Sequence, residues 1–357
     1  MRAKFAAFIA ILFCLTPTTY VFAQGEATVL FMMINAGARQ GGMGEAGVAD
    51  PSDANAIYWN PAGLAFEENT FDRSTQGEAT LMHVNWLPAF NLSDLYYDFA
   101  AGKYNLPGIG TVGLGIQFMN YGENNQTDVN GNLIGTFTSN EFAVTGAYGL
   151  KVKENLGIGV NLKFIYSRLS PVQVDIEQGK GVGSTFALDI GALYHPGFMK
   201  QLSIGANLAN FGPKITYIDK EQADPIPTNL RVGIAYRVLD SEFNRFTVLY
   251  DINRLMVPRD EEDRRVSFVS YLGSAWGGGD FFNRLTHSIG VEYWYTNLIA
   301  LRTGFFYEDP SYGARKFYTF GGGVRISFLG VDFSYILGTV EDSPLADTIR
   351  FSLSAIF

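Results

Sequence analysis

Apolar and polar residues alternate over most of this chain, and this pattern constrains its fold more than any other feature. In residues 156–166 the apolar positions are Leu156, Ile158, Val160, Leu162, Phe164 and Tyr166. Successive side chains of a β-strand point to opposite faces, so the pattern predicts strands with one apolar and one polar face. The same alternation recurs in 111–121, 228–239 and 349–357.

Charged residues follow the same parity. Extending the alternation along the chain places nine charged residues on the polar face: Lys163, Asp189, Arg231, Asp251, Glu292, Arg302, Arg325, Asp332 and Arg350. An Arg or Lys at the lipid midplane of a membrane barrel costs about 2–4 kcal/mol. Their consistent placement therefore favours strands with lipid on one side and a polar lumen on the other, over a soluble β-sandwich.

Fourteen segments carry this pattern, and most reach the length of about 9–11 residues that crosses a bilayer when tilted. They are 77–86, 95–104, 111–121, 140–150, 155–168, 183–195, 200–210, 228–239, 244–253, 285–296, 298–308, 316–328, 330–340 and 348–357. No segment approaches 18 consecutive apolar residues, which excludes a helical membrane protein. We predict an all-β fold, a fourteen-stranded antiparallel transmembrane β-barrel in the outer membrane of a Gram-negative bacterium.

The connections between these segments alternate in length, which predicts sidedness. Segments such as 105–110, 151–154 and 240–243 are short, whereas 122–139, 169–182, 211–227 and 254–284 are long. Outer-membrane barrels have short periplasmic turns and long external loops, so we expect both termini in the periplasm after processing. We interpret the stretch 265–275 as a fold-back within the longest loop, because counting it as a strand would give the barrel an odd number of strands.

The first 23 residues predict a cleavable signal peptide. Arg2 and Lys4 precede an apolar run, and Val21-Phe22-Ala23 forms a small-residue cleavage pattern before Gln24. The apolar run is about half of the ~20 residues that a membrane-spanning helix needs. Cys14 is the only cysteine, and it lies within this segment.

Residues 24–76 do not alternate and contain a cluster of small residues. Its distinctive positions are Gly37, Arg39, Gly41, Gly42, Met43, Gly44, Asp53, Asn55, Trp59, Asn60 and Pro61. The glycines lack the spacing of a dinucleotide-binding loop and follow no strand, so close backbone packing is the better interpretation. A barrel of fourteen strands is wide enough to need a plug, and we expect 24–76 to be a hatch inside the barrel formed by 77–357.

Composition argues against several functions. Without residues 1–23, which hold two basic and no acidic residues, the net charge falls from −9 to −11, and this disfavours a nucleic-acid partner. His83, His195 and His287 lack the spacing of metal ligands. The charged run 259–265 could bind Ca²⁺ but reads better as a solvated loop. No catalytic motif is present, so we expect no enzyme, no cofactor and no metal.

Apolar residues in the predicted connections are candidate docking positions for another protein. They are Leu87, Phe90, Leu92, Ile134, Phe137 and Ile226. The charges of the inner face would line a channel if the lumen were open. With a hatch in place, they would instead pair with one another and with the hatch backbone.

The sequence resembles the PorV/PorQ family of outer-membrane proteins over nearly the whole mature chain. The resemblance rests on seven blocks: Gly37–Gly44, Asp53–Asn55 with Trp59–Ala62, Asn140–Val144, Gly290–Tyr295, Arg315–Phe317, Asp332–Tyr335 and Ser343–Leu353. It implies a FadL-like fourteen-stranded barrel that serves the type IX secretion system. Such barrels bind the C-terminal sorting domain of cargo leaving the translocon and carry it to the attachment complex, whose sortase links the cargo to surface lipopolysaccharide.

Two functions of different classes remain open from the sequence. The first is a non-enzymatic cargo-binding barrel whose partners are sorting domains, the translocon, the attachment complex and outer-membrane lipid. The second is a FadL-like passive channel for hydrophobic small molecules, which needs an apolar pocket below the external loops. The charged inner face favours the first. A structural member with an unknown partner is a third, less specific interpretation.

Overall fold

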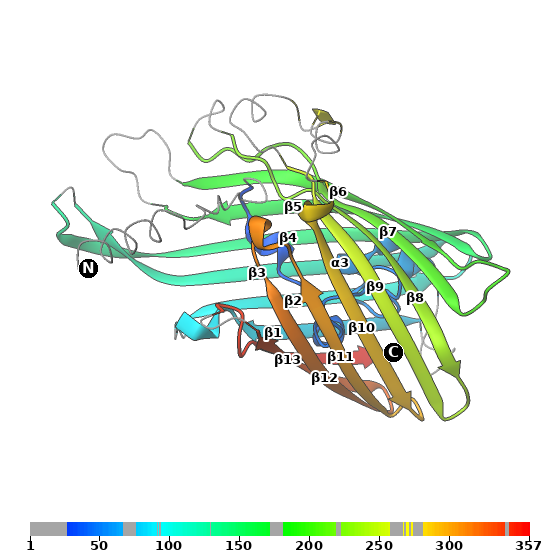
Figure 1. Ribbon diagram of the computed structural model, residues 1–357. Coiled ribbons are helices and arrows are strands. Elements are labelled where there is room, and N and C mark those ends of the chain that lie inside the picture. Colours follow the sequence, from blue (N-terminus) through cyan, green and yellow to red (C-terminus); the bar gives the residue numbers. More distant parts are fainter. Residues whose placement is uncertain are drawn as a thin grey trace, which may run out of the picture.

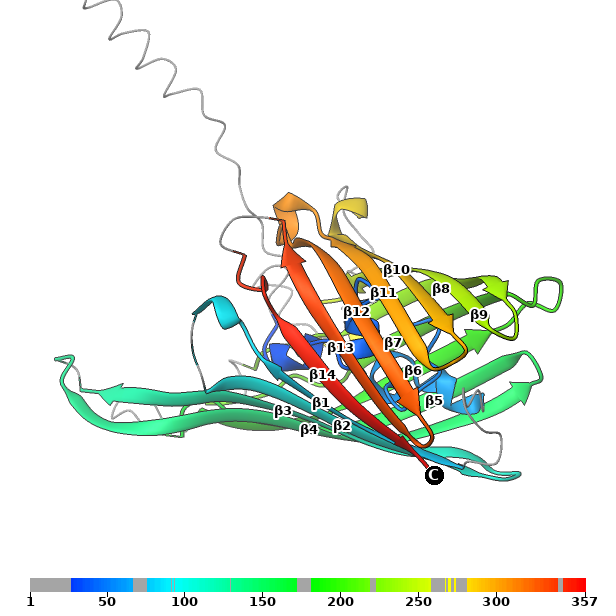
Figure 2. The same ribbon diagram turned by 90° about the horizontal axis from the view of Figure 1, so that it is seen from below.

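The computed structural model describes residues 27–66, 76–90, 92, 94–128, 130–171, 181–218, 223–257, 267, 269–270, 273, 281–339 and 343–357. Fourteen antiparallel strands close into a barrel in which each strand neighbours the next in sequence, and β1 pairs with β14 (Figures 1 and 2). The strands are β1 (Gly77–Asn85), β2 (Leu95–Leu106), β3 (Gly110–Thr127), β4 (Leu133–Lys153), β5 (Leu156–Arg168), β6 (Val182–Tyr194), β7 (Leu202–Phe211), β8 (Asn229–Asp240), β9 (Asn244–Leu255), β10 (Leu285–Tyr295), β11 (Ile299–Tyr307), β12 (Lys316–Ile326), β13 (Leu329–Gly338) and β14 (Ile349–Ile356). The predicted fold class is confirmed.

The two faces of the wall differ as the alternation predicts. On β5 the Leu162 side chain is 62% exposed on the outside, whereas the next residue, Lys163, is 3% exposed and faces inward. On β8, Val232 and Ile234 are exposed while Arg231 is buried. The apolar outer face suits hydrocarbon, and the charged side chains lie in the lumen.

The β3–β4 hairpin departs from the prediction. The segment 122–139, expected to be a long loop, is mostly strand, because β3 continues to Thr127 and β4 begins at Leu133. In Figures 1 and 2 this hairpin projects well beyond the neighbouring strands. The segment is rich in Asn, Gln and Thr and lacks apolar alternation, so sequence pattern alone does not reveal it.

The N-terminal segment lies inside the ring of strands (Figure 1). It contains four short helices: η1 (Leu30–Met33), α2 (Ala38–Gly41), α3 (Ala56–Trp59) and η2 (Pro61–Ala65). The seam of the barrel is the line where its first strand, β1, pairs with its last, β14. The N-terminal segment bonds to both of these strands, because the Gly37 N–H donates to Sδ of Met82 on β1 and the Ala38 N–H donates to Oγ of Ser352 on β14. Among the described residues, the connections also contain the short helices η3 (Pro88–Phe90), η5 (Phe282–Arg284) and η6 (Pro310–Tyr312). Across the described ranges, no helix combines the length and hydropathy needed to cross a membrane.

The two ends of the described chain lie at opposite ends of the barrel, which corrects the expectation that both termini share one side. Thr28 donates its backbone N–H to Pro225 and bonds the hydroxyl of Tyr217, both in the connection between β7 and β8 at the long-loop end. Phe357 instead bonds the backbone of Gly77, at the end with the short turns (Figure 2). The expectation came from the strands alone and did not consider a segment that threads the lumen.

Apolar side chains fill the lumen at its long-loop end. An apolar cluster near the long loops joins Phe31 and Met32 of the N-terminal segment to Tyr97, Met119 and Ile165 of the wall. The remaining space holds charged and amide side chains, which the next section describes. The interior is therefore a mixed core of a kind that needs its polar groups paired.

Candidate functional site

A chain of alternating charges runs along the inner wall of strands β10 to β13 and includes one residue of the N-terminal segment. Arg39 on α2 contacts both oxygens of Glu292 on β10, with Nε and Nη2 each 2.9 Å from an oxygen. Glu292 also accepts a bond from Nε of Arg302 at 2.7 Å, and Nη1 of Arg302 lies 2.6 Å from Asp332. Arg325 completes the chain by donating to the other oxygen of Asp332. All five side chains are at most 10% exposed.

Arg39 joins this wall network to the N-terminal segment itself. Its Nη2 lies 2.5 Å from Oδ2 of Asp50, and its Nη1 donates to the Ser52 hydroxyl and, at 3.4 Å, to Asp53. Burial lowers the pKa of Arg39, but the nearby carboxylates of Glu292 and Asp50 outweigh this and raise it above its ordinary value. The guanidinium is therefore a fixed positive charge that links two parts of the chain.

Backbone groups of the N-terminal segment also find partners on the wall. Gly47 and Val48 donate to Oδ2 of Asp251 on β9 at 2.7 and 2.9 Å. The side-chain amide of Asn60 donates to the backbone carbonyls of Val48 and Ala192, and its Oδ1 accepts from the Ala62 N–H at the start of η2. These bonds satisfy peptide groups that the lumen hides from water.

Further side-chain amides and an arginine of the wall also bond to the segment. Asn161 on β5 and Asn207 on β7 donate to the carbonyls of Ile57 and Trp59. The Trp59 indole N–H donates to the Ala36 carbonyl at 2.8 Å. On the opposite wall, Arg350 pairs with Glu45 at 2.8 Å. The inward charges thus pair with one another and with the segment, the second of the two alternatives that the sequence left open.

Gly44 shows why the segment contains so many small residues. Its φ is +65°, and an added Cβ would lie 2.6 Å from the Phe305 nitrogen and 2.5 Å from the Ile289 carbonyl oxygen. Gly304 on β11 faces it, and a Cβ there would lie 2.0 Å from the Gly44 nitrogen. Glycines on both sides let two backbones touch.

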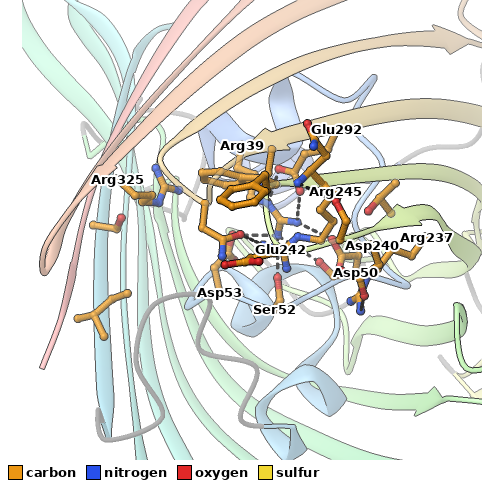
Figure 3. Close-up of a pocket in the computed structure, with 18 of the residues that line it drawn as sticks. Arg39, Asp50, Ser52, Asp53, Arg237, Asp240, Glu242, Arg245, Glu292 and Arg325 are labelled. Carbon is orange, nitrogen blue, oxygen red and sulfur yellow. Dashed lines mark hydrogen bonds and ion pairs between the residues drawn. The ribbon is translucent and has the colours of Figure 1, made fainter.

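A polar cavity of about 370 Å³ opens at the short-turn end of the lumen (Figure 3). Its inner side is lined by Arg39, Asp50, Asp53 and Glu292, and its mouth by residues of the β8–β9 turn such as Glu242. Asp50 was not singled out from the sequence, although it stands beside Ser52 and Asp53 in a short polar run. The cavity ends at the charge chain and is not apolar, so it does not resemble a site for a hydrophobic molecule.

The predicted docking residues separate into three groups. Phe90, Leu92 and Ile134 are 56%, 52% and 59% exposed, and Phe137 is partly exposed on β4. Leu87 is half-buried against the apolar cluster. Ile226 is 2% exposed inside that cluster, so it corrects the expectation of a surface position.

The three histidines occupy separate places, as their spacing in the sequence suggests. His83 contacts Asp98, His195 contacts Ser203, and His287 contacts Tyr250. Within the described ranges, no three His, Cys, Asp or Glu side chains gather as metal ligands would. The signal peptide, the charged run 259–265 and most of the fold-back at 265–275 lie outside the described residues.

Comparison with solved structures supports the fold. The chain is 14% identical to the toluene transporter TodX of Pseudomonas putida with a TM-score of 0.57, covering 90% of this chain and 99% of TodX. A Pseudomonas aeruginosa FadL homologue is 13% identical with a TM-score of 0.50, covering 90% of this chain and 98% of that one. The CymD monoaromatic hydrocarbon channel is 13% identical with a TM-score of 0.51, covering 93% and 99%. No curated protein sequence matches the chain.

The closed ring of strands with an apolar outside defines an outer-membrane β-barrel of the FadL-like fold. A family model described as "Type IX secretion system protein PorV" matches residues 23–262. This match covers more than half of the chain, so the protein belongs to the PorV family, the outer-membrane barrels of type IX secretion.

Proposed function

We propose that this barrel binds the C-terminal sorting domain of secreted proteins and carries them from the translocon to the attachment complex at the cell surface. It does so without catalysing a reaction. The observation that supports this best is the occupied lumen: Arg39 of the interior segment is joined to Glu292 and Arg302 of the wall in one buried network. A barrel that is closed inside is suited to act through its outer and external surfaces.

In this proposal residues 27–66 serve as a hatch. Opening a passage would break the Arg39–Glu292 pair and leave charges without partners in the lumen, which costs several kcal/mol. It would also separate Gly47 and Val48 from Asp251. The hatch keeps the membrane sealed while large cargo is handled outside.

The long-loop end offers surfaces for a protein partner. Phe90, Leu92 and Ile134 expose apolar side chains there, and the β3–β4 hairpin extends away from the barrel (Figure 2). Apolar groups on exposed connections commonly mark protein contacts. These features suit a polypeptide cargo better than a small molecule.

A channel for hydrophobic molecules is the second candidate, and one observation favours it. An apolar cluster lies below the long loops, where such a channel would hold its substrate. Phe31 and Met32 of the chain itself are almost fully buried in that cluster, so its space is already taken. Transport would require this segment to leave.

Deleting the gene separates the two functions. We expect the deletion strain to lose surface-attached proteins and to accumulate them in the periplasm, as measured by proteomics of shaved cells and of the periplasmic fraction. Uptake of toluene or of a long-chain fatty acid, measured in the same strains, is expected to stay unchanged. Normal surface display together with lost uptake would overturn the proposal in favour of the channel.

Direct binding provides a second test. The full-length barrel, solubilised in detergent, should retain the isolated C-terminal domain of an exported protein from the same host. The same exported protein without that domain is the matched control. Equal retention of both would show that the domain is not what the barrel recognises.

A further inference from the structure

The β3–β4 hairpin forms a two-stranded ribbon outside the barrel. β2 pairs with β3 only as far as Tyr121, and β5 pairs with β4 only as far as Asn140. Beyond these points β3 and β4 pair only with each other in the described part of the chain, from Glu123 opposite Thr138 to Thr127 opposite Leu133. We call residues 123–127 and 133–138 the ribbon.

One hydrogen bond reveals which backbone groups point away from the ribbon. Glu123 donates its N–H to Oδ2 of Asp94, on the side away from β4. In an antiparallel ladder, the backbone N–H and C=O groups of two facing residues either all point toward the partner strand or all point away from it. The backbone groups of Thr138, which faces Glu123, therefore also point away from the ladder. Because this direction alternates along a strand, the backbone groups of Thr136 also point away from the ladder, whereas those of Phe137 face Asn124.

The two edges of the ribbon differ. The β3 edge is partly covered, because Asp94 accepts from Glu123 and its carbonyl accepts from the Asn120 side chain. On the β4 edge, the described residues place no backbone partner beside Thr136 or Thr138. An edge of this kind is a template for another strand.

The ribbon also lacks the features that usually protect an open edge. Proteins block such edges with Lys, Pro or inward charges, but residues 121–140 contain no Lys, Arg or Pro. Their only charged residues are Glu123 and Asp128, both acidic. Near the tip, Leu133 and Ile134 are 64% and 59% exposed. The ribbon is therefore open to pairing and electrostatically complementary to a basic strand.

We infer that the β4 edge at Thr136 and Thr138 captures an extended, neutral or basic strand of an exported protein by β-strand addition. The captured strand would continue the line of β5, which leaves β4 at Asn140. Backbone bonds would supply affinity that tolerates many sequences, and Leu133 and Ile134 would favour apolar side chains in the partner. This inference rests on the proposed function and assigns its docking surface.

A matched pair of proline variants tests the edge. Thr136→Pro removes an outward N–H on the β4 edge, and Asn125→Pro removes one at the directly opposite position on the β3 edge. The probe is the isolated C-terminal domain of one exported protein, titrated against each full-length variant in detergent. We expect Thr136→Pro to raise Kd at least about fivefold, the effect of roughly one hydrogen bond, and Asn125→Pro to leave it unchanged. Equal effects of the two variants would overturn the edge assignment.

A shortened hairpin covers the case in which Thr136→Pro folds poorly. Replacing 125–136 by Asn-Gly joins Asn124 to Phe137, whose backbone groups face each other across the ladder, through a favoured two-residue turn. This variant should form a normal barrel, seen as a normal heat-dependent shift on SDS gels, yet should lose the probe. Retained binding would overturn the inference and leave the proposed function standing.

Cross-linking in cells identifies the occupant. A photo-reactive maleimide on Thr138→Cys should join the barrel to exported proteins, whereas the same reagent on Asn125→Cys should not. A cross-link between two copies of the barrel would show that the edge mediates self-association and would overturn the inference. Unchanged surface display after gene deletion would instead overturn the proposed function itself.

Discussion

Arg39 and Glu292 lie 253 residues apart in the sequence and meet as a two-pronged ion pair in the lumen. One residue belongs to the N-terminal segment and the other to the wall, so the pair fixes the position of one part against the other. Bidentate contact adds geometric specificity to the charge attraction.

Breaking this pair should destabilise the barrel strongly. Arg39→Met removes one of the two arginines that pair with the buried Glu292, and we expect a loss of about 3–5 kcal/mol in the free energy of unfolding. Urea unfolding of the detergent-folded protein, followed by gel shift, measures it. The control is Arg237→Met, whose pair with Asp240 is 30% and 52% exposed and should contribute less than about 1 kcal/mol. Similar losses for both variants would contradict a structural role for the lumen pair.

Gly44→Ala tests the backbone contact with β11. The new methyl would meet the Phe305 backbone at 2.6 Å and would sit at φ +65°, so we expect destabilisation of about 2–4 kcal/mol. Gly146→Ala is the control, because a Cβ at Gly146 has no neighbour within 4 Å. Thermal unfolding of the two variants in detergent compares them, and a wild-type transition for Gly44→Ala would show that the segment does not press against the wall.

Cysteine labelling tests the positions of the two ends of the described chain. Cys14 lies in the predicted signal peptide, so a single added cysteine is the only thiol of the processed protein. Leu30→Cys should react with a membrane-impermeant maleimide on intact cells, because Leu30 is 56% exposed at the long-loop end. Phe198→Cys, in the short turn after β6 and 84% exposed, should react only after the outer membrane is permeabilised. The reverse pattern would invert the assigned sidedness.

An introduced arginine should impair assembly of the barrel at one exposed leucine and not at another. Leu162 on β5 and Leu133 on the ribbon are 62% and 64% exposed, but the first faces lipid and the second lies beyond the barrel. We expect Leu162→Arg to cost about 2–4 kcal/mol and to reduce the amount of assembled barrel, and Leu133→Arg to leave assembly unchanged. Heat-modifiable protein in isolated outer membranes measures both, and tolerance of Arg at position 162 would argue against lipid contact there.

The strands could be predicted because each of them faces two solvents. Positions such as Leu162 and Lys163 must differ when one meets hydrocarbon and the other the lumen, so alternation appears directly in the sequence. The outer half of the β3–β4 hairpin meets water on both faces and is held by backbone bonds. It therefore has no alternation, and the sequence pattern predicts a loop there.

The partners within the lumen could not be predicted in the same way. Parity placed Glu292, Arg302 and Asp332 on the inner face, but which charges meet depends on strand register and on where Arg39 enters. Ile226 lies between two prolines in a polar connection, a pattern typical of exposed loops. It is buried because that connection folds back into the lumen, and no local signal reports this.

The contacts of the N-terminal segment with β14 set an order on biogenesis. Ala38 bonds Ser352, 314 residues later, and Glu45 pairs with Arg350. The first residues to be exported therefore cannot complete their contacts until the last strand has been delivered and the ring has closed. Filling the interior and sealing the seam are one event, and a nascent barrel lacking its final strand would have an unsatisfied interior as well as an open edge, two defects that quality-control proteases could detect.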